Sequence, residues 1–189
     1  MSRTQVKAFN LRGLVAVLRR ERTLATVCEK VSPGSRAMIE DPPAANGWLD
    51  AAVINEVYSV IVTLWGEAEL RRVVRDSLEQ GALVVLRPAV EAIFRLFGVH
   101  PATCFARLPM FAAPNSRGYE WTYVSEGANR GVVRLTLANE RDVPRAAYVA
   151  AAGVLEAILE LCSVKGRVHD PEMIENGYGN SARLRVEWE

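Results

Sequence analysis

The chain has 189 residues, half of them hydrophobic, and its 23 lysine and arginine residues nearly balance 22 aspartate and glutamate residues. This length is typical of one domain, and the near-zero net charge removes the electrostatic basis for binding nucleic acid or an anionic membrane surface. We therefore expect a single domain over residues 1–189, without a nucleic-acid or membrane partner.

The N-terminal residues lack a secretory-signal pattern, and we find no apolar run of about 18 residues that would span a bilayer. A cytoplasmic location is the expectation that follows. The three cysteines, Cys28, Cys104 and Cys162, are far apart in the sequence and sit among apolar neighbours. Such a pattern favours buried reduced thiols over disulfides or a metal site.

Apolar residues recur at helical spacing through the first half of the chain. A first helical hairpin is expected to end at Pro33-Gly34, and a loop rich in proline and alanine follows over residues 41–47. The helices expected here cover residues 11–18, 24–31, 49–64, 67–80, 83–97 and 101–107. Pro109 is expected to close the last of them.

After Met110 the apolar residues recur at every second position instead of at helical spacing, which indicates strands. Residues 119–127 and 130–138 alternate as an antiparallel pair, and residues 144–163 form an alanine-rich helix with a proline in its first turn. Residues 164–169 and 183–188 are two further strands. The order predicts an α+β domain: a helical half over about 1–112, packed on a four-stranded, largely antiparallel sheet over about 113–189 with a covering helix.

The order of elements resembles the superfamily that contains haem nitric-oxide-binding domains, 4-vinyl reductase domains and Golgi-transport ligand-binding proteins. More narrowly, it is similar to small bacterial proteins of that type that are abundant in myxobacteria. The residues that carry the resemblance are Gly98-Val99-His100-Pro101, Arg107-Leu108-Pro109-Met110-Phe111, Arg117-Gly118-Tyr119, Ala150-Ala151-Ala152-Gly153-Val154-Leu155-Glu156 and Leu184-Arg185-Val186-Glu187-Trp188.

Two departures from the family's patterns bear on its cofactors. The haem-binding branch holds the haem with a helical histidine and a Tyr-x-Ser-x-Arg motif; here Tyr123 and Ser125 are followed by Gly127, and His100 is the only upstream histidine. The cysteines that end 4-vinyl reductase domains are missing from residues 177–182. We therefore predict that the protein holds neither haem nor zinc and has no cofactor.

We find no nucleophile, metal-ligand set or phosphate loop in the sequence and predict that the protein is not an enzyme. The resemblance implies a small-molecule-binding sensory or regulatory module, a homodimer, whose pocket for a small apolar ligand lies between the helical half and the sheet. The candidate pocket residues are aromatic: Trp65, Phe94, Phe97, Phe105, Tyr123 and Tyr148. The alternative is a ligand-free protein-interaction or assembly factor with the same fold, which would have a protein partner.

Overall fold

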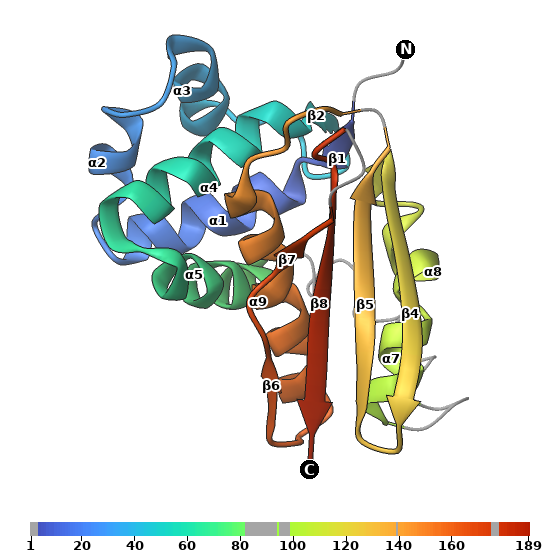
Figure 1. Cartoon of the computed structure of the whole chain (residues 1–189). Helices are drawn as coiled ribbons and strands as arrows, with labels where there is room; N and C mark the ends of the chain where they lie inside the picture. The colour runs from blue at the N-terminus through green and yellow to red at the C-terminus, as the bar shows by residue number, and fades with distance from the viewer. Residues whose placement is uncertain (1–3, 82–93, 95–98, 139, 175–177) are drawn as a thin grey trace.

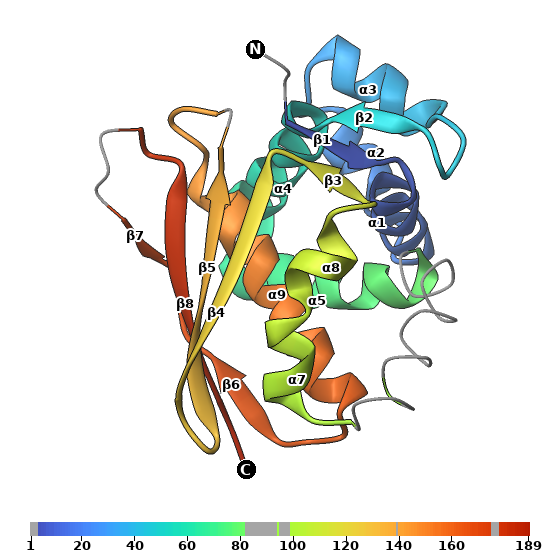
Figure 2. The same cartoon turned by 90° about the vertical axis from the view of Figure 1, so that its right-hand side faces the viewer.

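The computed structural model describes residues 4–81, 94, 99–138, 140–174 and 178–189. In Figure 1 the helices within residues 9–80 lie on one side of the molecule and a long antiparallel sheet lies on the other. The turned view in Figure 2 shows that one long helix, α9, runs between the sheet and the helices of the first half. The α+β class predicted from the sequence is confirmed.

The N-terminal half begins with five helices: α1 (Phe9–Arg20), α2 (Leu24–Cys28), α3 (Pro33–Glu40), α4 (Ala51–Trp65) and α5 (Glu67–Gln80). The Asp50 side chain accepts a hydrogen bond from the Ala52 amide and so caps the start of α4. Gly66, at a φ of 89°, ends α4 and leads directly into α5. The sequence predicted both of these helices to within two residues.

The helix α3 was not predicted, because Pro33 was interpreted as a stop signal. Proline at the first position of a helix loses no hydrogen bond and has a suitable φ, so it can also begin one. The Ser32 side chain accepts a hydrogen bond from the Ser35 amide and caps this start. The same error was made at Pro109, which lies in the first turn of α8 (Leu108–Ala112), immediately after α7 (Pro101–Ala106).

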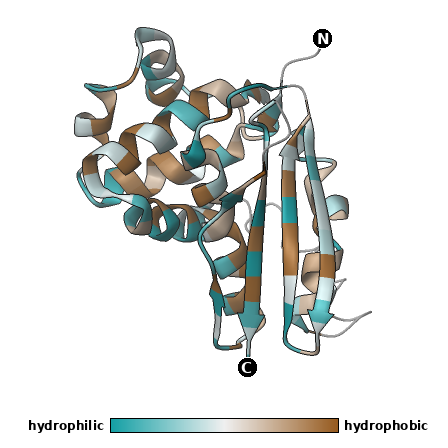
Figure 3. Ribbon diagram, viewed as in Figure 1, coloured by the Kyte–Doolittle hydropathy of each residue, from teal (hydrophilic) through white to brown (hydrophobic). Residues whose placement is uncertain are grey.

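The main sheet is antiparallel, with the order β4-β5-β8-β6, and β7 pairs with the start of β8. Its strands are β4 (Tyr119–Gly127), β5 (Arg130–Leu137), β6 (Gly166–Val168), β7 (Glu172–Met173) and β8 (Ser181–Trp188). Strand β8 alternates buried apolar residues with exposed charged ones, and Figure 3 shows this as alternating brown and teal bands. The last strand of the chain is therefore a central strand of the sheet.

A second, small sheet was not predicted. It has the order β2-β1-β3 and joins three distant segments: β1 (Gln5–Lys7), β2 (Trp48–Asp50) and β3 (Ser116–Arg117). Strands of two or three residues are too short to show an alternating pattern. This sheet connects the N-terminus to the start of α4 and to the segment before β4.

Helix α9 (Arg145–Leu161) joins the two halves. Its residues Val149 and Ala150 belong to the hydrophobic core among α1, α4 and α5, whereas Ala151 and Leu155 belong to the core against the sheet. At Gly153 the helix approaches α5 so closely that an added Cβ would lie 2.7 Å from the Arg71 carbonyl oxygen. One helix contributing to both cores supports the prediction of a single domain.

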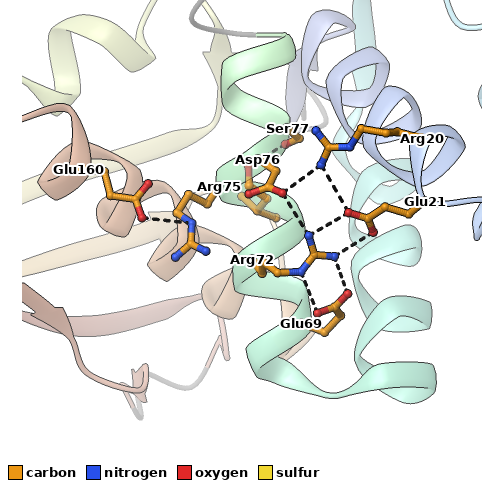
Figure 4. Close-up of polar contacts among 9 residues, drawn as sticks. Arg20, Glu21, Glu69, Arg72, Arg75, Asp76, Ser77 and Glu160 are labelled. Carbon is orange, nitrogen blue, oxygen red and sulfur yellow. Dashed lines mark hydrogen bonds and ion pairs between the residues drawn. The ribbon is translucent and has the colours of Figure 1, made fainter.

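The charged face of α5 is paired rather than merely solvated. Figure 4 shows the Arg72 guanidinium between the carboxylates of Glu21, Glu69 and Asp76, with N–O distances of 2.8, 2.6 and 3.1 Å. Hydrogen bonds from Arg72 are the main reason that the pKa values of Glu21 and Glu69 lie below their ordinary value. The end of α1 is thereby tied to α5.

Candidate functional site

A partly open cavity of about 200 Å³ lies between the helical half and the sheet. Its walls come from both halves: α1, α4, α5 and α8 on one side, and β4, β5 and α9 on the other. The described residues that line it are Val6, Phe9, Asn10, Ile54, Asn55, Tyr58, Leu78, Leu108, Phe111, Ala112, Asn115, Ser116, Tyr119, Trp121, Leu135, Ala147, Ala150, Ala151 and Val154. This is the location predicted for a ligand pocket.

The polar groups of the wall are amides and hydroxyls. Asn10 donates a side-chain hydrogen bond to the Lys7 carbonyl at 3.1 Å, and Asn115 donates one to the Phe111 carbonyl at 2.7 Å. Asn55 differs from them: its side chain is only 8% exposed, and its Oδ1 has no hydrogen-bond partner among the described residues. A buried acceptor without a donor costs about 1–3 kcal/mol, so Asn55 is a polar group that a ligand could satisfy.

Two tyrosines of the wall, Tyr58 on α4 and Tyr119 on β4, are uncharged at neutral pH. Burial raises the pKa of both, and the neighbouring Tyr58 and Glu140 further raise the pKa of Tyr119. The other described residues of the wall are apolar or carry amide or hydroxyl groups, and none of them has an ionised side chain. The arrangement suits the burial of a small neutral molecule more than proton transfer or nucleophilic attack.

Of the six candidate pocket residues, Phe97 lies outside the described residues and Phe94 is half-buried. Trp65 is 37% exposed at the end of α4, far from the cavity wall, beside a shallow hollow formed with Glu21 and Glu69.

The other three candidates come together in the core against the sheet. The rings of Phe105 and Tyr123 have centroids 5.7 Å apart, and Tyr148 is fully buried in the same core. None of the five described candidates is in the described wall of the cavity. Their part in ligand binding stays a prediction.

The residues that do line the cavity were missed, although one signal was present. Residues 54, 57, 58 and 61 form the apolar face of the helix predicted over 49–64, and Asn55 lies beside them. An asparagine at the border of an otherwise apolar, buried helix face is unusual and indicates a specific polar partner. The aromatic lining residues Phe9, Phe111 and Trp121 carried no comparable signal.

The cysteines lie away from the cavity. Cys104 and Cys162 are buried with their Sγ atoms 3.6 Å apart, and Cys28 is half-buried elsewhere. The contact with Cys162 lowers the pKa of Cys104, and the same contact raises that of Cys162. Within the part of the chain that the structure describes, no group of three or more histidine, cysteine or acidic side chains could hold a metal ion.

The sequence matches no family model, and no curated protein matches it. Solved structures do. An H-NOX protein from K. algicida with unliganded Fe(II) has a TM-score of 0.68 at 8% identity, over 97% of this chain and 96% of that chain. A T. tengcongensis H-NOX structure has a TM-score of 0.58 at 11% identity, over 97% of both chains.

A third structure, from work on haem redox potential and porphyrin distortion, has a TM-score of 0.63 at 10% identity over 97% of this chain and 95% of that chain. The chain has the H-NOX fold. At these identities the likeness concerns the fold, and it confirms the resemblance to haem nitric-oxide-binding domains that the sequence indicated.

The residues of the H-NOX-like chain do not fit a haem. Its two histidines are both described, and neither lines the cavity. His100 Nδ1 accepts a hydrogen bond from the Ala102 amide, and its ring meets Trp188 edge-on with centroids 5.9 Å apart. His169 Nε2 lies 3.5 Å from the Glu187 carboxylate.

The volume of the cavity and the missing arginine of the Tyr-x-Ser-x-Arg motif also argue against a bound haem. Ser125 donates a hydrogen bond to the carbonyl of Gly127, the residue that replaces the motif's arginine, so this part of the motif forms a local turn. The cavity of about 200 Å³ is close in size to a cavity of about 150 Å³ that holds benzene, whereas a porphyrin is several times larger.

Among the described residues, no helix is both long enough and apolar enough to cross a membrane.

Proposed function

We propose that the chain is a non-enzymatic sensory or regulatory module that binds a small apolar molecule in the cavity between its helical half and its sheet. The observation that carries the proposal is this partly open, largely apolar cavity, because small-molecule sites in proteins are concave and lined mostly by apolar side chains. Its walls come from both halves, so a bound molecule would contact the helices and the sheet at once. A ligand in this position could alter how the two halves pack.

The fold supports this function, since the H-NOX structures similar to it include one with unliganded Fe(II) and one from work on haem. The size of this pocket and its uncharged described wall favour a ligand smaller than haem. The alternative function, a ligand-free interaction or assembly factor, would favour a contiguous exposed apolar patch. The large exposed apolar side chains, such as Met38, Val124 and Met173, come instead from separate elements.

The homodimer, a protein partner and a cytoplasmic location remain proposals. Two features that can form a dimer interface, an open strand edge and a group of small residues, serve other purposes here: β8 is paired on both sides, and the small residues around Ala150 and Gly153 pack within the chain. A dimer would therefore use another surface. Sedimentation velocity at micromolar concentration tests it, and a single monomeric species would remove this part of the proposal.

The main test is binding of indole, a neutral molecule of two fused rings, measured by isothermal titration and by thermal shift. We expect saturable binding and a higher melting temperature with ligand. Native mass spectrometry of freshly purified protein would additionally report a retained ligand. Titration with haem is expected to give no Soret band characteristic of a bound haem, and a band that is lost in His100→Ala would contradict our assignment.

Ala150→Leu is the matched variant for the cavity. Ala150 is buried and lines the cavity, so a larger side chain should occupy the void, abolish indole binding and leave stability equal or higher. Ala152, on the same helix, is fully buried in the sheet core and does not line the cavity. Ala152→Leu should instead lower stability by about 1–3 kcal/mol through overpacking. Equal losses of stability in both variants would argue against an open cavity.

A further inference from the structure

The volume of the cavity limits the size of the ligand. An apolar cavity of about 150 Å³ is known to hold one benzene molecule. The cavity between α4, α9 and the sheet is about 200 Å³, which leaves room for one ring with a substituent or for two fused small rings.

The side chains of the wall indicate an aromatic ligand. Five aromatic rings among the described residues, from the four elements α1, α4, α8 and β4, line the cavity: Phe9, Tyr58, Phe111, Tyr119 and Trp121. Aromatic rings attract one another in offset-stacked or edge-to-face geometry by about 0.5–1.5 kcal/mol beyond the burial of their area. A flat ring among them would contact both α4 and β4.

The electrostatics of the wall favour a neutral ligand. Its described side chains are uncharged, so an ionised ligand would be buried without a countercharge, which is costly. Burial is the main cause of the raised pKa of Tyr119, and the nearby carboxylates of Glu140 and Asp50 raise it further, so they would also repel an anion beside this tyrosine. An anionic ligand would therefore be disfavoured twice, by desolvation and by repulsion.

Asn55 specifies what polar group the ligand should carry. The residue is part of the cavity wall, and its Oδ1 has no hydrogen-bond partner among the described residues and is covered by its neighbours, so a ligand donor reaches it only when the Asn55 side chain turns toward the cavity. Tyr58 lies three residues later on the same helix and lines the cavity beside it. A ligand N–H or O–H that bonds to Asn55 would remove the cost of the unpaired acceptor.

We propose that the cavity binds a neutral aromatic molecule of one or two rings that carries a single N–H or O–H donor, and that this donor bonds to the side-chain amide of Asn55. The inference rests on the proposed function and adds the chemical class of the ligand. It assigns Asn55 as the residue that determines specificity, and the aromatic wall as the source of most of the affinity.

The experiment compares indole with indene, which has the same shape and no N–H donor, by isothermal titration against the full chain. The wild type should bind indole about tenfold more tightly than indene, the factor expected for one buried hydrogen bond. Asn55→Leu, which has nearly the same volume, should lose this preference and bind indene at least as tightly as the wild type does. Benzyl alcohol should likewise bind at least tenfold more tightly than the benzylammonium cation of the same size.

The outcomes separate the two proposals. Equal affinity of the wild type for indole and indene, or a preference that survives Asn55→Leu, would overturn the role of Asn55 and leave the ligand-binding function standing. Tighter binding of benzylammonium would overturn the neutral class. Binding of none of the four probes, with normal folding confirmed by circular dichroism, would remove the proposed function and this inference with it.

Discussion

The crossing of α5 and α9 can be tested with one methyl group. A Cβ on Gly153 would lie 2.7 Å from the carbonyl oxygen of Arg71 and 3.1 Å from its Cα, and both are backbone atoms that cannot move aside without shifting the helix. Gly153→Ala should therefore push the two helices apart. Overpacking of this kind costs about 1–3 kcal/mol, whereas alanine gains up to about 1 kcal/mol over glycine in helix propensity.

The expected net effect of Gly153→Ala is a loss of roughly 1–2 kcal/mol, which for a chain of this size lowers the melting temperature by roughly 2–8 °C. Gly34 in α3 provides the control, because a Cβ there meets nothing within 4 Å. Gly34→Ala should raise stability by about 0.4–1 kcal/mol. Urea unfolding followed by circular dichroism measures both. A Gly153→Ala variant as stable as Gly34→Ala would refute the close crossing.

Three further predictions concern stability. Leu155→Asp places an unpaired carboxylate in a fully buried position and should cost several kcal/mol, enough to leave much of the protein unfolded by circular dichroism, so a nearly unchanged melt would contradict the sheet-covering role of α9. Trp188→Ala should lower the free energy of unfolding in urea by about 3–5 kcal/mol, since Trp188 is buried, and a loss below about 1 kcal/mol would count against that burial. Arg72 lowers the pKa of Glu21 and Glu69 in the folded state. The contribution of these two carboxylates to the free energy of unfolding is therefore fully present above their unfolded pKa of about 4.3, and it is lost as the pH falls through the lowered folded values. Arg72→Leu should therefore flatten the acid side of the stability profile, and a profile parallel to the wild type would exclude this linkage.

The elements with a long regular period were predictable. The helix over Glu67–Gln80 and the strand over Tyr119–Gly127 have the bounds that the sequence indicated, because each holds its period over nine or more residues and ends at a glycine. The failures occurred where one residue permits two structures. Pro33 can end a helix or begin one, and only the Ser32 cap and the contacts of α3 decide between them.

The cavity lies where the sequence predicted a ligand pocket, and its described wall is made by other residues than the described candidates. The aromatic residues chosen from the sequence, such as Phe105 and Tyr148, are buried as expected, but they fill a core. Periodicity shows which side chains face the interior, and it carries no information on whether the opposing side chains fill the space. A void depends on the sum of volumes from α1, α4, α8, β4 and α9, which are brought together only by the fold.

The fold of this chain and the residues of its cavity wall give different information about haem binding. The fold sets an interior between a helical layer and a sheet, and so it sets where a ligand can lie. The ligand is decided by the groups that face that interior. Here both histidines lie outside the cavity wall, and Asn55 presents an unpartnered amide within it. A chain can therefore keep the H-NOX fold without a histidine in its described cavity wall, which is why we propose a ligand smaller than haem.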